Sequence, residues 1–151
     1  MRTLPRWGIG IVGDDRPEGM LTIGLGSTLI SKAELFSRNV QFTGDHRAKL
    51  LGLGGVWTAS KYRGRGFASS LMVQARQLAV MDHYNGTVLF SLENTVPFYE
   101  SLGYTRHTGA AFMKQPNQDK FLVPAHVAVM TLLIADWVDP SDPITVEGLP
   151  W

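Results

Sequence analysis

The segment VWTASKYRGRGFASSLM, which begins at residue 56, constrains the fold more than any other part of the sequence. The apolar stretch at residues 50–58 is rich in glycine and leads directly into a charged turn. Across residues 66–82, apolar side chains recur at spacings of three and four, with polar side chains between them. This pattern predicts a strand, a tight turn and an amphipathic helix in immediate succession.

The residues of this turn have the chemistry of an anion site. Backbone N–H groups at a helix N-terminus lack partners within the helix, and the helix dipole adds to their attraction for phosphate. Gly64, Gly66 and Ala68 place no bulky side chain before those donors, while Arg63 and Arg65 supply positive charge. The turn lacks both the Gly-Lys-Ser/Thr of a P-loop and the third glycine of a dinucleotide fingerprint. These residues alone support a phosphate site and a plain strand-to-helix turn equally.

Strands and helices alternate through the rest of the chain. A strand hairpin is predicted around residues 21–58, with a polar turn at residues 43–47. Residues 87–92 predict a buried strand, and residues 95–102 a short helix with Pro97 in its first turn and Gly103 at its end. Further strands are predicted at residues 7–12 and 125–135, and the proline-containing tail from residue 136 is expected to be irregular.

Composition excludes several classes of function. The 151 residues fit a single domain, and no segment is long and apolar enough to span a bilayer. No secretion signal is recognisable, so a cytoplasmic protein is expected. The absence of cysteine excludes disulfides, thiolate metal sites and a cysteine nucleophile. A net charge of +1 provides no field for nucleic acid or an anionic membrane, so neither is expected as a partner.

Two segments together resemble a known family. The spacing Arg63-x-x-Gly66-x-Ala68, between an apolar strand and a helix, looks like the acyl-CoA signature of the GNAT superfamily of N-acetyltransferases. The segment PFYESLGY, which begins at Pro97, is similar to that superfamily's second signature, a helix with a tyrosine that ends in leucine-glycine-aromatic. Residues 111–151 resemble the branch of the aminoglycoside 2'-N-acetyltransferases and the nodulation-factor N-acyltransferase.

The resemblance implies a single α/β (α+β) domain of GNAT-like fold over residues 1–151. Its central sheet would be mixed, mostly antiparallel and twisted, with about six to seven strands flanked by helices. Acetyl-CoA is implied as the co-substrate, without a metal, and the acetyl group would pass directly to a primary amine of a small molecule such as an aminoglycoside. In this superfamily the strand before the turn diverges from its neighbour, and its backbone binds pantetheine. The implied cofactor-binding residues are Val56, Trp57, Thr58, Arg63, Gly64, Arg65, Gly66, Phe67, Ala68 and Ser69.

The resemblance also assigns catalytic residues. Tyr99 matches the tyrosine that protonates departing coenzyme A thiolate, and a phenol pKa of about 10 against a thiol pKa of about 8.5 suits that role. The alternative is that Phe98 and Tyr99 only pack. A general base is harder to assign, because the strand position where some relatives carry glutamate reads Leu53-Gly54-Gly55. Glu93 ranks first because it lies near Tyr99 in the sequence. The other candidates are Asp119, His107, His126 and the C-terminal carboxylate of Trp151.

The acceptor site is expected to be open. Gly54 and Gly55 would line it, and the carboxylates of Asp119 and Trp151 would bind the amine, as in related enzymes. Superfamily members usually carry helices before the hairpin, whereas about twenty residues precede it here, which implies a shortened N-terminal helical region. A second subunit, in a homodimer, or the C-terminal tail would then cover the acceptor site. The alternatives are a non-catalytic acyl-CoA-binding or assembly domain, and a nucleotide-binding module.

Overall fold

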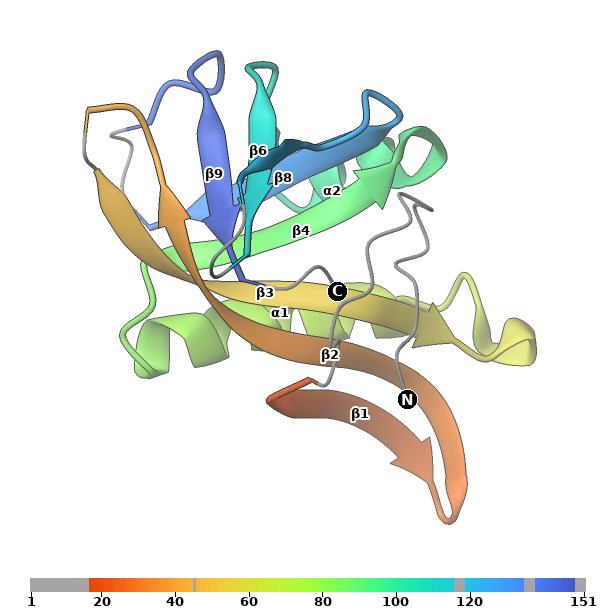
Figure 1. The fold of residues 1–151 in the computed structure, drawn as a ribbon. Coiled ribbons are helices and arrows are strands. Elements are labelled where there is room, and N and C mark those ends of the chain that lie inside the picture. Colours follow the sequence, from red (N-terminus) through yellow and green to blue (C-terminus); the bar gives the residue numbers. More distant parts are fainter. Residues whose placement is uncertain (1–16, 45, 116–118, 135–137, 149–151) are drawn as a thin grey trace.

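The computed structural model describes residues 17–44, 46–115, 119–134 and 138–148. A single nine-stranded sheet forms the centre of this part of the chain (Figure 1). The strand order is β5-β8-β4-β3-β2-β9-β6-β7, and β1 pairs with β2 beside this path. Of the described strand pairs, β3–β4 and β6–β9 are parallel and the others antiparallel. The expected α/β (α+β) class, with a mixed and mostly antiparallel sheet, is confirmed.

The predicted hairpin lies at residues 19–58 and contains three strands. β1 (Gly19–Leu25) and β2 (Thr28–Gln41) are joined by a tight turn in which Gly26 has a φ of +61°, a value that favours glycine. β2 continues through the polar turn into β3 (Arg47–Thr58). The glycines of residues 24–26 therefore divide one apolar stretch into two strands.

The predicted helices are both present. α1 (Phe67–Met81) buries Leu71, Met72, Ala75 and Ala79, which form the apolar stripe read from the sequence. A 3-10 turn, η1 (Ser60–Tyr62), links β3 to the turn before α1. β4 (Gly86–Leu92) is followed by a second 3-10 turn, η2 (Glu93–Thr95), and by α2 (Val96–Ser101). The last five strands are β5 (Thr105–Arg106), β6 (Ala111–Lys114), β7 (Phe121–Leu122), β8 (Val127–Leu133) and β9 (Ile144–Glu147).

Alternating side chains of the central strands divide the core into two parts. Leu51 and Leu53 of β3 pack in a cluster with Met72 and Ala75 of α1. Leu50, which points to the other face of β3, packs with residues of β6, β8 and β9. The sheet is therefore covered by α1 on one face, while β6 and β9 enclose the second cluster (Figure 1).

The tail differs from the prediction, because residues 144–147 form β9 between β2 and β6. Ile144 and Val146 are buried, and Val146 lies opposite Val40 of β2. Prolines mark the flanking loops, but the ITVE segment alternates buried and half-buried residues as a strand does. With β9 and the two-residue strands β5 and β7, the described sheet exceeds the expected six to seven strands. The strand predicted at residues 7–12 lies outside the described residues.

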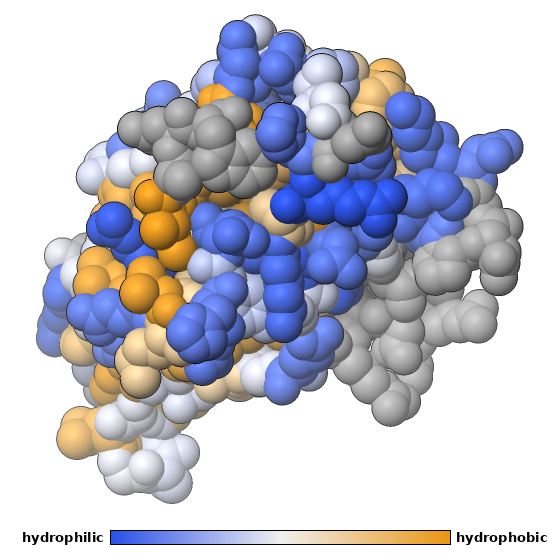
Figure 2. All heavy atoms as spheres, turned by 90° about the vertical axis from the view of Figure 1, so that its left-hand side faces the viewer, coloured by the Kyte–Doolittle hydropathy of each residue, from blue (hydrophilic) through white to orange (hydrophobic). Residues whose placement is uncertain are grey.

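The side of the molecule at the left of Figure 1 carries a mixture of hydrophilic and hydrophobic residues, with hydrophilic ones in the majority (Figure 2). None of the described helices is long and apolar enough to cross a membrane.

Candidate functional site

β3 and β4 separate before either strand ends. Their parallel pairing covers Leu51 to Leu53 on β3, and its last pair joins Leu53 to Leu89. Beyond this pair, Phe90 to Leu92 continue to pair with β8, while β3 runs on beside β2 (Figure 1). In the described part of the chain, β3 and β4 therefore do not pair with each other beyond Leu53 and Leu89. This is the divergence that the family resemblance implied.

A bulge interrupts β3 at the same level. Glu34 of β2 lies opposite Gly54 and Lys32 lies opposite Trp57, so two residues of β3 face the single Ala33 of β2. Gly55, one of those two, has a φ of +53°, which favours glycine. Of the two glycines predicted at the acceptor site, Gly55 therefore lies in this bulge with Val56, and Gly54 pairs with Glu34 just before it.

A cavity of about 420 Å³ opens at the turn between β3 and α1. Most of the predicted cofactor-binding residues line it, and Val56, Trp57 and Arg65 do not. A side chain added at Gly64 or Gly66 would meet no atom within 4 Å, and both residues have positive φ. The cavity wall consists of Thr58, Tyr62, Arg63, Gly64, Gly66, Phe67, Ala68, Ser69 and Phe98.

The N-terminus of α1 presents free donors to this cavity. Gly66 is the N-cap and supplies no side-chain hydrogen bond, while the first helical bond of the described structure joins Ser70 N to the Gly66 carbonyl at 3.0 Å. Among the described residues, nothing accepts the backbone N–H groups of Phe67, Ala68 and Ser69. Such unpaired N–H groups at the positive end of a helix dipole favour a bound anion.

Three positive side chains lie on or next to the turn, and one of them, Arg63, lines the cavity. Lys61 Nζ lies 5.1 Å and Arg65 Cζ 5.6 Å from the centre of the Tyr62 ring, so both side chains make cation–π contacts with this ring. Arg63 Nε donates to the Thr58 carbonyl at 3.1 Å, which fixes its guanidinium beside the turn. All three cations are exposed and free to meet a charged group of a ligand.

Tyr99 lies on α2, next to the cavity-lining Phe98. The ring centre of Tyr99 is 5.0 Å from that of Phe98 and 5.9 Å from that of Tyr104. Val56, near the end of β3, and Tyr99 of α2 both pack against the core cluster that contains Leu53 and Met72. Burial raises the pKa of the Tyr99 phenol above its ordinary value, so the hydroxyl keeps its proton at neutral pH. The position of Phe98 in the cavity could not be predicted from the sequence, since its motif also fits simple packing.

The other predicted residues lie in different surroundings. Glu93 is exposed and forms a bidentate ion pair with Arg106, with one contact of 2.9 Å between Oε2 and NH1. The hydrogen bonds from Arg106 lower the pKa of Glu93, which weakens this carboxylate as a base. Asp119 and His126 are exposed. Trp151 lies outside the described residues.

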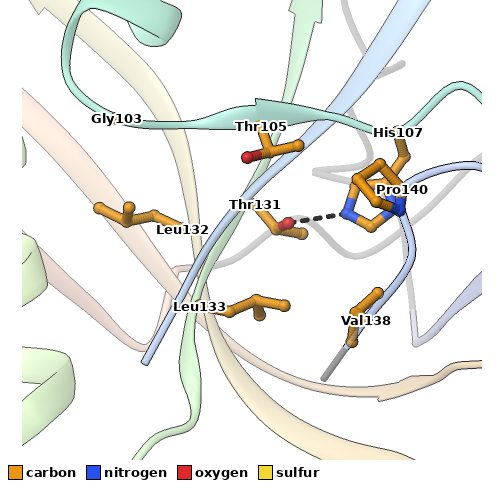
Figure 3. Close-up of a pocket in the computed structure, with 8 residues that line it drawn as sticks. All are labelled: Gly103, Thr105, His107, Thr131, Leu132, Leu133, Val138 and Pro140. Atoms are coloured by element: carbon orange, nitrogen blue, oxygen red, sulfur yellow. Dashed lines mark hydrogen bonds between the residues drawn. The ribbon is translucent and has the colours of Figure 1, made fainter. Parts of the chain in front are cut away.

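His107 lines a second cavity, of about 140 Å³, that shares no residue with the first (Figure 3). Its Nε2 lies 2.7 Å from Thr131 Oγ1, and its buried Nδ1 has no hydrogen-bond partner in the described structure. Burial lowers the pKa of His107 and keeps the ring neutral. The described residues contain no group of three His, Asp or Glu side chains placed to hold a metal ion.

Comparison with known proteins agrees with this arrangement. The family model described as "Acetyltransferase (GNAT) domain" matches residues 16–107. Among solved structures, a GCN5-related N-acetyltransferase from Kribbella flavida is 25% identical with a TM-score of 0.52, covering 60% of this chain and 22% of that one. This chain thus spans less than a quarter of the length of that protein. No curated protein sequence matches this chain.

Two further solved structures are similar in fold. A provisionally assigned N-acetyltransferase from Lactobacillus plantarum has a TM-score of 0.54 at 21% identity, with 77% of this chain and 68% of that chain covered. A provisionally assigned streptothricin acetyltransferase from Bacillus anthracis, solved in complex with acetyl coenzyme A, has a TM-score of 0.53 at 19% identity. The similarity covers 81% of this chain and 65% of that chain.

Proposed function

Since the chain belongs to the GNAT family of acetyltransferase domains, we propose that it transfers the acetyl group of acetyl-CoA to a primary amine of a small molecule. In this proposal the amine attacks the thioester directly while both substrates are bound. Residues of the turn and of the β3 end bind the co-substrate, and Tyr99 acts on the leaving thiolate.

The observation that carries the proposal is the cavity at the start of α1. Three backbone N–H groups without a described partner, an open pair of glycines and the cation of Arg63 meet there, and Lys61 and Arg65 contact the ring of the cavity-lining Tyr62. A pyrophosphate needs these features, because its oxygens accept hydrogen bonds and its charge must be balanced. Pantetheine, an extended chain with amide groups, would then pass between the diverging strands and pair with the backbone of Val56, Trp57 and Thr58.

Acetyl-CoA would supply the activated carbonyl, and Tyr99 would supply the proton that its thiolate takes up. A phenol with a raised pKa stays protonated across the range in which amines react, so Tyr99 still carries its proton when the thiolate departs. No described residue hydrogen-bonds the Tyr99 hydroxyl, which leaves it available to the substrate.

A small amine as the acceptor rests on the resemblance of residues 111–151 to the aminoglycoside-acetylating branch. That branch, the contribution of Asp119 and Trp151 to amine binding, and a second subunit over the acceptor side all stay predictions. The exposed acid Asp119 would attract a cation, while Gly54 and Gly55 would leave room for it beside β3.

Release of thiol from acetyl-CoA tests this function with a panel that contains kanamycin, spermidine and a lysine-containing peptide. Turnover is expected with at least one small amine, and Tyr99→Phe should lower kcat about 100-fold with little change in the affinity for acetyl-CoA. The matched control is Tyr84→Phe, because Tyr84 is half-buried after the end of α1 and does not line the cavity. Binding of acetyl-CoA without turnover of any amine would instead favour the acyl-CoA-binding domain.

A further inference from the structure

We propose that Glu34 of β2 is the catalytic residue that accepts the proton of the attacking amine, and that Gly55 leaves the space its carboxylate occupies. This inference rests on the acetyl transfer proposed above. It places the missing acid on the strand next to β3, although no acid occurs at residues 53–55 of β3 itself.

The contact between Glu34 and Gly55 carries the argument. A Cβ atom built on Gly55 would lie 2.6 Å from Glu34 Oε2 and 2.7 Å from Glu34 Cδ. Both distances are shorter than those that real Cβ atoms make with their neighbours. The carboxylate therefore fills the position that a side chain at residue 55 would take. Because the bulge also gives Gly55 a φ of +53°, glycine is favoured here for two independent reasons.

The alternation of side chains shows on which face this carboxylate lies. Leu35 of β2 packs in the core cluster that contains the α1 residues, and Val56 and Tyr99 pack against that cluster. Glu34 precedes Leu35 along β2 and so points to the opposite face of the sheet. Glu34 and Tyr99 thus approach the level of the strand separation from opposite faces, as a base and an acid acting on two sides of one carbonyl would.

One oxygen of the carboxylate is anchored and the other is available. Lys32 Nζ donates to Glu34 Oε1 at 2.9 Å. Oε2, which faces Gly55, has no hydrogen-bond partner in the described part of the chain. On the flanking strands Glu34 pairs with Met20 and Gly54, neither of which titrates, so Lys32 is the charged side chain beside it in the described structure. About a quarter of the Glu34 side chain is exposed, which gives an amine access.

Glu34 and Tyr99 together account for both proton transfers of the acetyl-transfer step. The amine nitrogen forms a bond to the acetyl carbon as the carbon–sulfur bond breaks, and one proton of the amine passes to Glu34 Oε2. The departing sulfur takes the proton of the Tyr99 hydroxyl. Glu34 then releases its proton to solvent and Tyr99 regains one, so the enzyme returns to its starting state.

Glu34→Gln tests the assignment, with Glu18→Gln as the matched control. Glu18 also faces β2, where its Oε2 accepts from Ser37 N at 3.2 Å, but it has no contact with Gly55. Glu34→Gln should lower kcat at least about 100-fold and keep the Kd for acetyl-CoA within about twofold. Glu18→Gln should retain the kcat of the natural sequence.

Gly55→Ala provides a second test, because its methyl group would displace the Glu34 carboxylate without removing it. A comparable loss of kcat is expected, and retained acetyl-CoA binding would show that the variant folds. If Gly55→Ala does not fold, the kcat of Glu34→Gln alone tests the assignment of Glu34.

The outcomes separate the two proposals. If the natural sequence turns over an amine and Glu34→Gln keeps kcat within about threefold, or if Glu93→Gln causes the large loss of kcat instead, the Glu34 assignment is wrong while acetyl transfer stands. If the natural sequence releases no thiol with any amine, both proposals fail together.

Discussion

Single polar residues in the core make the stability of this protein sensitive to pH. His107 is buried, its side chain makes one described hydrogen bond, to Thr131, and its Nδ1 has no hydrogen-bond partner among the described residues. Protonation would place an uncompensated charge in the core, which is why burial lowers the pKa of this ring.

We therefore predict that the protein becomes less stable as the pH falls. With the folded-state pKa of His107 lowered, the unfolded chain binds the proton first, so stability is fully present above the unfolded pKa of about 6.5 and declines below it. Urea unfolding between about pH 7.5 and about pH 5 should show this decline, and His107→Gln should reduce its slope. The exposed His126 serves as the control, since His126→Gln should leave the slope unchanged. An unchanged slope in His107→Gln would show that other groups cause the decline.

Only some of the single residues in the candidate site can be predicted from the sequence. Tyr99 and the glycines of the turn belong to motifs a few residues long, so their resemblance to the family signatures predicts them as site residues. Glu34 belongs to no motif, because its place beside Gly55 depends on the register of β2 against β3 and on the bulge between them. The pairing of Glu93 with Arg106 was equally hidden, since the two residues are joined through the fold.

Among the secondary-structure elements, local patterns predicted those whose residues carry a complete signal. α1 has its apolar stripe, α2 its proline and terminal glycine, and β4 a continuous apolar run. β9 was missed because four residues between proline-containing loops give a weak signal, and pairing with β2 and β6 stabilises it. The two-residue strands β5 and β7 likewise exist through their partners.

The contact between β4 and β8 depends on a glycine. Gly86, at the start of β4, has a φ of +148°, and a Cβ atom there would collide with the backbone of Leu132 and Leu133 on β8. Gly86→Ala should therefore lower the free energy of unfolding by about 2–4 kcal/mol, because strain and a backbone clash act together.

Gly26→Ala is the matched control for that prediction. Its φ of +61° imposes strain, but no atom lies within 4 Å of the added methyl group. A smaller loss, on the order of 1 kcal/mol, is expected in urea unfolding. Equal losses in the two variants would show that the close approach of β8 contributes nothing.

In the molecule as a whole, the two substrates are proposed to meet where the sheet separates. α1 and its turn lie on one face, where the acyl donor is proposed to bind, while Glu34 points to the other face. The proposed donor side can be predicted from the sequence, because strand, turn and helix are contiguous there. On the proposed acceptor side the sequence predicts Gly55 but not Glu34, because the contact between them depends on the pairing of β2 with β3 and on the bulge.

Calorimetric titration of acetyl-CoA into Ala68→Glu tests the central claim most directly. Ala68 lines the cavity in the first turn of α1. A glutamate there would interact favourably with the helix dipole, but its negative charge would repel the pyrophosphate. The account predicts a folded variant whose Kd is weaker by at least about 100-fold, or about 2.7 kcal/mol. Ser70→Glu adds the same charge outside the cavity wall and should weaken binding by less than about fivefold. An Ala68→Glu variant that binds acetyl-CoA as tightly as the natural sequence would contradict the account.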